Sequence, residues 1–183
     1  MTTHTVDEAL DRFALIASAG SENTNKACAM TALAWIAGED WSDRPVCAHP
    51  LLASWVIDVN DLDTTTVEQR QDLIRAGETG VIDTRLVPTA VLLDCWSRAA
   101  GSGVSKVLNV ISLVAAWKAA TSHVPPDIVY ANLTGVNLRY ADLRDANLRY
   151  ADLRYADLTD AYCPIGDVPV GYLRTKTGHL VRS

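Results

Sequence analysis

Hydrophobic positions recur at helical spacing through the first 120 residues, in segments separated by glycine, proline and polar turns. The first predicted helix runs from about 5 to 18 and opens with the capping box Thr5-Val6-Asp7-Glu8. A second capping-box pattern, Thr65-Thr66-Val67-Glu68, opens another helix further along. The segment 25–37 is apolar nearly all round, so we expect it to be the central helix. The pattern predicts helices at about 5–18, 25–37, 50–59, 65–77, 88–100 and 104–121.

From residue 126 onward the period changes to five residues. Six successive blocks place a small residue first, Asn or Asp second and Leu third. A period of five fits neither a helix nor a strand, so we expect the chain to turn a corner every five residues. The first and third positions then point inward, and the fourth and fifth point outward. The leucines are Leu133, Leu138, Leu143, Leu148, Leu153 and Leu158, and Cys163 stands at the next such position.

This run resembles the pentapeptide-repeat family over about 126–165. The resemblance implies a right-handed β-helix of roughly square section with four repeats per coil, and therefore two coils here. The predicted fold class is α+β: an all-α helical domain at 1–124, a short right-handed quadrilateral β-helix at 125–165, and a capping tail at 166–183. We expect the tail to form a hairpin near Gly178 that covers one end of the coils. The helix at 104–121 is the candidate cover for the other end.

Four repeats per coil place residues twenty apart on one face, which predicts that Tyr130 stacks on Tyr150 at about strand spacing, roughly 4.8 Å. Tyr155 falls on the next face. The arginines of four successive repeats form a belt in which no face carries two, and they either pair with nearby Asp or bind a partner. Tyr and Arg are enriched at binding hot spots. The predicted partner-binding residues are Tyr130, Tyr150, Tyr155, Arg149, Arg154 and, in a polar loop of the helical domain, Trp41.

The net charge and the length of the apolar stretches argue against two classes of partner, nucleic acids and membranes. The net charge of −6 lies entirely in residues 1–125, whereas residues 126–183 hold seven acidic and seven basic residues. Phosphate contacts need clustered cations, so we expect no nucleic-acid partner. No apolar stretch reaches the roughly 20 residues of a membrane-spanning helix. The N-terminus has no signal peptide and the cysteines are irregularly spaced, so we expect a cytoplasmic protein with free thiols and no membrane partner.

The search for catalytic and metal-binding residues centres on one loop. Cys28, Cys47 and His49 follow a C-x₁₈-C-x-H pattern, which supplies three ligands without a second pair, whereas a zinc site usually needs four. Cys47 and His49, with Asp43 nearby, could instead act as a nucleophile and its base. An ordinary structural loop between two apolar helices is the favoured interpretation. We therefore predict no catalytic residues, no bound metal and no cofactor.

The favoured function is a non-catalytic protein-binding module with a protein partner, and a homo-oligomer is compatible with it. The family resemblance also implies an alternative, a DNA-mimicking inhibitor of a type II topoisomerase. This chain departs from that pattern because its repeat region is short, neutral and rich in arginine. A second alternative is an enzyme that uses the Cys47/His49 loop. The segment 27–61 also resembles uncharacterised actinobacterial and actinophage proteins, which points to such an origin but implies no function.

Overall fold

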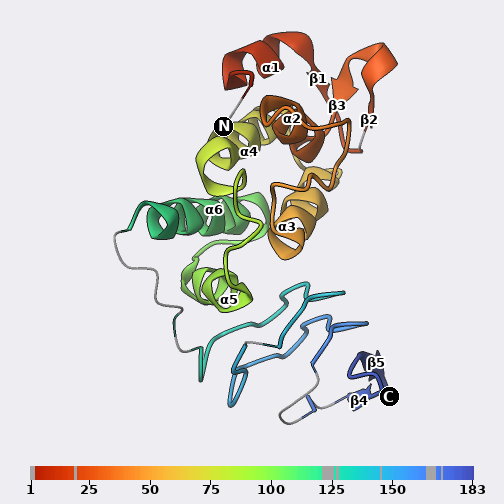
Figure 1. Cartoon of the computed structure of the whole chain (residues 1–183), viewed down its shortest axis with the longest axis vertical. Helices are drawn as coiled ribbons and strands as arrows, with labels where there is room; N and C mark the ends of the chain where they lie inside the picture. The colour runs from red at the N-terminus through yellow and green to blue at the C-terminus, as the bar shows by residue number, and fades with distance from the viewer. Residues whose placement is uncertain are drawn as a thin grey trace. The chain divides into compact units, whose positions relative to one another are not determined.

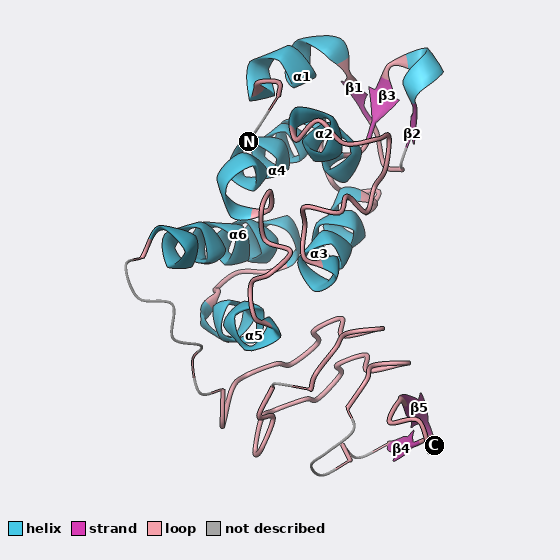
Figure 2. Cartoon of the chain, in the orientation of Figure 1, coloured by secondary structure: helices cyan, strands magenta, loops and turns pink. Residues whose placement is uncertain are grey.

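The computed structural model describes residues 3–18, 20–120, 126, 128–144, 146–163, 168–169 and 171–183 (Figure 1). Within these residues six α-helices and a few short strands make an α+β chain whose N-terminal part is helical (Figure 2). The chain divides into two compact units. The first comprises Met1–Leu86 with Ala99–Thr121, and the second comprises Val87–Arg98 with Ser122–Ser183.

The first unit is a helical core. Helix α4 packs against α2 and α6, and α3 packs against the same two helices. A Cβ built on Gly80 in α4 would lie 2.3 Å from the Ile111 carbonyl oxygen in α6, so only glycine allows this close approach. All of α2 except Trp35 is buried, which confirms it as the central helix. The helices are α1 (Val6–Arg12), α2 (Ala29–Ile36), α3 (Pro50–Asn60), α4 (Val67–Gly80) and α6 (Gly103–Ala119).

The first two helices are shorter than the pattern predicts. The Thr5–Glu8 capping box is present, with bonds of 3.2 and 2.7 Å, but α1 ends at Arg12. Three two-residue strands follow in the order β1-β3-β2: β1 (Ala14–Leu15), β2 (Gly20–Ser21) and β3 (Lys26–Ala27). Because β3 pairs with both neighbours, α2 cannot begin before Ala29.

The connection from α3 to α4 is fixed by buried polar groups. Thr65 donates its hydroxyl hydrogen to the Val59 carbonyl, so Thr66 caps α4 and the capping box is Thr66 with Gln69, one residue later than predicted. The buried Arg70 guanidinium donates to the Asn60 carbonyl at 2.9 and 3.2 Å and to the Thr65 carbonyl at 2.6 Å. A cation at the C-terminus of α3 satisfies carbonyls that the helix leaves open.

In the second unit, the described residues of the repeat region are joined by isolated parallel bridges rather than by long strands. Each bridge links positions twenty residues apart: Asn132 with Asp152, Asn137 with Asp157, and Asp142 with Tyr162. Leu133, Leu138, Leu143 and Leu158 are buried as expected. Leu148, predicted to be buried, is only half-buried, as is Leu153, because these repeats are incompletely covered by the rest of the described chain.

Polar contacts from helix and hairpin reach the two ends of the repeat region. Helix α5 (Thr89–Arg98) accepts the Asn132 N–H at Ser97 Oγ, 2.9 Å away, and donates from Thr89 Oγ1 to the Asp142 carbonyl at 3.0 Å. Sequence reasoning had assigned this covering role to the helix at 104–121. The tail forms a hairpin of β4 (Tyr172–Arg174) and β5 (Leu180–Arg182). Leu180 exchanges backbone hydrogen bonds with Asp160 and Ala161 of the last coil.

Candidate partner-binding surface

The fifth position lies in the left-handed backbone region in every repeat whose fifth residue the structure describes. Tyr130, Tyr140, Tyr150 and Tyr155 have φ between 58 and 66°, and Gly135 at the equivalent place has φ 67°. The carbonyl of each third-position residue accepts the N–H of the next repeat's first residue, three positions later. This is a type II turn, whose third residue favours Gly or Asn. The four tyrosines are 61–90% exposed, so this geometry holds them in solvent.

The second position of each repeat stabilises the same turn. Its Asn or Asp side-chain oxygen accepts the backbone N–H two residues later, at 3.0–3.2 Å in all six repeats from Asn132 to Asp157. Only Asn and Asp form this Asx-turn readily. The repeat sequence has only Asn or Asp at this position. The structure explains why, because the turn needs their side-chain oxygen as an acceptor.

Tyr130 and Tyr150, which are twenty residues apart, stack on each other, which confirms the predicted pair. Their ring centroids are 5.1 Å apart with an interplanar angle of 14°. The Arg149 guanidinium carbon lies 5.0 Å from the centroid of the Tyr150 ring, a cation–π contact. Tyr155, at 90% exposure, makes no ring contact within the described part of the chain.

The repeat arginines differ in how their charge is balanced. Where the second position is Asp, the arginine binds it: Arg154 Nε and Nη2 lie 2.9 and 2.6 Å from the Asp152 carboxylate. Hydrogen bonds from the Arg154 side chain and backbone lower the pKa of Asp152 to about 2. The repeat of Arg149 has Asn147 instead, and Arg149 forms no ion pair with any described carboxylate. Arg149 therefore keeps an unneutralised charge, whereas Arg154 follows the alternative of local pairing.

Trp41 belongs to the other compact unit. It is half-buried rather than exposed, with its ring 5.5 Å from Phe13 in an edge-to-face contact. Its indole Nε1 is buried and has no hydrogen-bond acceptor within the described residues. Of the six predicted binding residues, the structure therefore groups Tyr130, Tyr150 and Arg149 by direct contact, and it gives Trp41 packing contacts of its own.

The Cys47/His49 loop has the chemistry of a structural loop. Burial, with the hydrogen bond and charge of Glu39, raises the pKa of Cys47 to about 11. A thiol with this pKa stays protonated at neutral pH, whereas a cysteine nucleophile must be a thiolate. His49 Nδ1 accepts the Leu51 N–H at 3.2 Å and so caps α3. Within the described residues no three His, Cys, Asp or Glu side chains gather as metal ligands.

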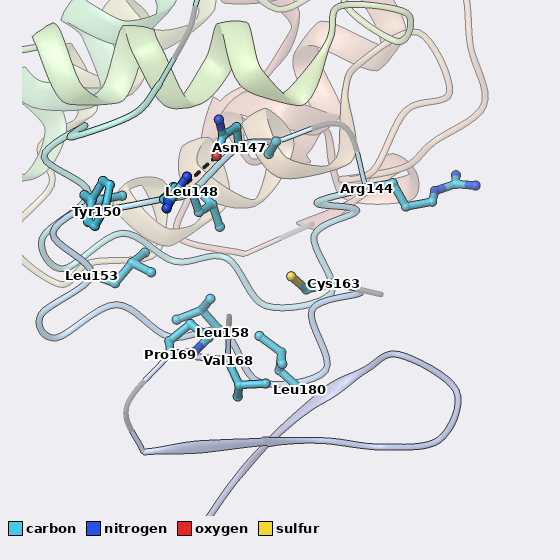
Figure 3. A pocket seen from close by; sticks show the side chains of 13 residues that line it. Arg144, Asn147, Leu148, Tyr150, Leu153, Leu158, Cys163, Val168, Pro169 and Leu180 are labelled. Carbon is cyan, nitrogen blue, oxygen red and sulfur yellow. Dashed lines mark hydrogen bonds between the residues drawn. The ribbon is translucent and has the colours of Figure 1, made fainter. Parts of the chain in front are cut away.

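A cavity of about 620 Å³ lies against the second coil (Figure 3). Its apolar lining includes Leu148, Leu153, Leu158 and Leu180. A neighbouring cavity of about 610 Å³ shares Ala151, Leu153, Leu158 and Pro169. Sequence reasoning missed both cavities, because the repeat pattern marks each leucine as equally internal and carries no signal of where a coil is left uncovered.

The repeat run can now be compared with known proteins. Residues 127–162 match the family model described as Pentapeptide repeats, in eight copies. This segment therefore belongs to the pentapeptide-repeat family, whose proteins are generally non-catalytic protein-interaction modules. Comparison of the chain with curated proteins and with solved structures gives no match. The resemblance of 27–61 to actinobacterial and actinophage proteins stays a prediction.

No helix in the described part of the chain is both long enough and apolar enough to cross a membrane.

Proposed function

We propose that this chain is a non-catalytic protein-binding module whose repeat region is a short right-handed quadrilateral β-helix. Bridges between residues twenty apart support four five-residue repeats per coil. The proposed contact surface comprises Tyr130, Tyr150, Tyr155, Arg149 and Arg154. Four free cysteines fit a reducing compartment such as the cytoplasm. An actinobacterial or phage origin rests on the resemblance of segment 27–61 alone.

One observation carries this proposal: bulky tyrosines occupy left-handed turn positions that favour glycine. Gly135 occupies the same position, and a Cβ built there would meet no atom within 4 Å. The turn therefore needs no side chain at this place, and a non-glycine residue there costs about 1–2 kcal/mol. Strained residues cluster at functional sites. Exposed tyrosines kept against this cost, at Tyr130, Tyr150 and Tyr155 in the proposed surface, support a role in recognition rather than in folding.

The arginines add positive charge to this surface, and they differ in how readily each could pair with a carboxylate of the partner. Arg149 lies over Tyr150 and has no described carboxylate partner, so a partner's carboxylate could pair with it without displacing an internal one. Arg154 would first have to share or release Asp152. The backbone beneath both is held by turn and inter-coil hydrogen bonds, which lowers the ordering cost of binding.

The two alternative functions have less support. Thiolate chemistry at Cys47 is opposed by its raised pKa. DNA mimicry is opposed by the neutral composition of residues 126–183. Neither alternative is favoured by a specific contact or charge in the described residues.

The experiment starts with affinity capture from the native host to identify a partner, followed by measurement of its dissociation constant. The double substitution Arg149→Ala with Arg154→Ala, and separately Tyr130→Ala with Tyr150→Ala, should each weaken binding at least 10-fold. The melting temperature should change little, since these side chains are exposed. Tyr140→Ala is the matched control, because Tyr140 has the same turn geometry on another face. Unchanged binding by both double variants would rule this surface out.

A further inference from the structure

The same backbone groups of each coil form the hydrogen bonds to the next coil. The N–H of a third-position residue donates to a second-position carbonyl in the next coil. Leu133 donates in this way to Asp152 at 2.9 Å, and Leu138 donates to Asp157 at 2.7 Å. The N–H of a fifth-position residue donates to a fourth-position carbonyl, as Gly135 does to Arg154 at 2.9 Å. The first-position carbonyl of Ala131 accepts the Asp152 N–H. The second coil carries the same groups on its far side.

The C-terminal tail supplies hydrogen-bond partners for half of the backbone groups on that far side. The Tyr172 hydroxyl accepts the Leu158 N–H at 2.9 Å and donates to the Ala156 carbonyl at 3.2 Å. The Asp160 and Cys163 N–H groups donate to carbonyls of Leu180 and Gly178 beside β5. The tail therefore takes the place of a third coil along residues 156–163.

The backbone groups of the other half have no such partners within the described residues. The N–H groups of Leu148, Tyr150, Leu153 and Tyr155 and the carbonyls of Ala146 and Ala151 have no hydrogen-bond partner within the described part of the chain. We refer to residues 146–155 as the open edge. Unpaired strand edges of this kind are templates for pairing with another chain.

An apolar cavity lies beneath the open edge. Leu148 and Leu153 line the cavity of about 620 Å³ and are only half-buried, unlike the fully buried Leu133 and Leu138 of the first coil. Figure 3 shows Leu158, Val168 and Leu180 gathered on the side of this space opposite Leu148, with Arg144 pointing away. The volume accommodates a leucine-sized side chain together with backbone.

We propose that the open edge binds an extended peptide segment of a partner, which adds as a strand and inserts a leucine-sized side chain over Leu148 and Leu153. The adjoining part of the same edge already takes an extended strand in this way: β5 pairs with Ala161, and its Leu180 is fully buried at the cavity wall. Strand addition gives affinity through backbone bonds and specificity through the side-chain pocket. Arg149, which borders the cavity without a described carboxylate partner, favours an acidic residue beside the apolar one.

This site borders the tyrosine–arginine surface and shares Arg149 with it, but it uses the backbone edge and the cavity rather than the outward rings. A matched comparison in the free protein tests the edge itself. Amide hydrogen exchange measured by NMR should be at least 100-fold faster at Leu153 and Tyr155 than at Leu133 and Gly135, which hold the same repeat positions but are hydrogen-bonded. Equal protection at monomeric concentration would show that the chain closes its own edge and would overturn the proposal.

Binding is tested with a fluorescein-labelled synthetic peptide of the chain's own residues 151–160, ADLRYADLTD, which in the protein lies along the first coil and so imitates a third one. Fluorescence anisotropy should show saturable one-to-one binding, at least 10-fold weaker when both peptide leucines are replaced by asparagine. Ala151→Trp, which fills the cavity, should weaken binding by the same factor, whereas Tyr130→Ala should not alter it. Exchange protection at Leu133 and Gly135 reports whether each variant keeps its fold.

Two further results would overturn the proposal. One is equal affinity for the leucine and asparagine peptides, or the same peptide affinity for folded Ala151→Trp as for the native protein. The other is sedimentation showing a dimer in which Leu153 and Tyr155 are protected and the peptide does not compete, because the occupant is then a second copy of this chain. Loss of partner binding in Tyr130→Ala, with peptide binding retained, would separate this site from the proposed contact surface.

Discussion

Tyr155 is a residue whose side chain and backbone have opposite preferences. Its φ of 60° suits glycine, and its ring is 90% exposed. Tyr155→Gly should therefore leave the free energy of unfolding unchanged or raise it by about 1 kcal/mol, since relief of left-handed strain exceeds the entropy that glycine adds to the unfolded chain. Thermal and denaturant melts measure the change.

The reverse substitution at the equivalent position is the control. Gly135→Ala, at φ 67° with open space around the Cβ, should lower the free energy of unfolding by about 1 kcal/mol through backbone conformation alone. A destabilisation of Tyr155→Gly by more than about 1 kcal/mol would mean that the ring supports the fold, and the argument for recognition would lose its basis.

Asp152 makes the stability of the repeat region depend on pH. Hydrogen bonds from Arg154 lower the pKa of its carboxyl from 3.8 to about 2. A lowered pKa in the folded state stabilises the protein above about pH 4, and this contribution disappears as the pH falls towards 2. The native chain should therefore lose more stability between pH 4 and 2 than Asp152→Asn does.

Asparagine is the suitable replacement because Asn137 and Asn147 form the same backbone turn bond as Asp152. At pH 7 the two proteins should differ little, since the Asp152–Arg154 pair is exposed. Denaturant unfolding at a series of pH values measures both effects. Parallel stability curves for the two proteins below pH 4 would contradict the assigned role of the carboxylate.

Among the elements, the leucine row of the repeat region is not uniform. Leu143 is 2% exposed, whereas Leu148 is half-buried. Leu143→Ala should cost about 2–5 kcal/mol, because it removes a buried side chain and leaves a cavity. Leu148→Ala should cost about 1–2 kcal/mol, because part of that side chain already contacts water in the folded protein. Calorimetry that found Leu148→Ala the more damaging substitution would refute this order.

Periodic features could be predicted from the sequence, and features without a period could not. The five-residue spacing placed Leu133, Leu138, Leu143 and Leu158 and the Tyr130–Tyr150 stack correctly because each depends on the repeat alone, but it did not show that Leu148 and Leu153 are less buried. The strands β1 to β3 were missed, since two-residue strands carry no alternation. The left-handed turn was missed because tyrosine, unlike Gly135, is not a turn residue in sequence patterns. Helix α5 was not recognised as the helix that contacts the repeats, because Thr89 and Ser97 have no distinctive spacing.

In the whole molecule, the net charge is divided unevenly between the two parts of the chain. All of the net charge of −6 lies in residues 1–125, and the repeat segment is balanced. Two of its acidic residues, Asp142 and Asp152, form ion pairs with Arg144 and Arg154 of their own repeats. The exposed groups of the repeat region include aromatic rings and a few cations, which supports the proposal of a protein partner.

This charge distribution predicts that the chain does not inhibit a type II topoisomerase by imitating DNA. Duplex DNA carries one negative charge per roughly 1.7 Å of axis. Two coils at strand spacing rise only about 10 Å, and the residues that form them have no net charge. A DNA-binding groove lined with cations would gain no electrostatic attraction from this region. In a supercoiling assay with purified gyrase, activity should stay at the level of the untreated enzyme up to tens of micromolar chain. An acidic pentapeptide-repeat inhibitor serves as the positive control, and inhibition at low-micromolar concentration that survives Arg149→Ala with Arg154→Ala would disprove the prediction.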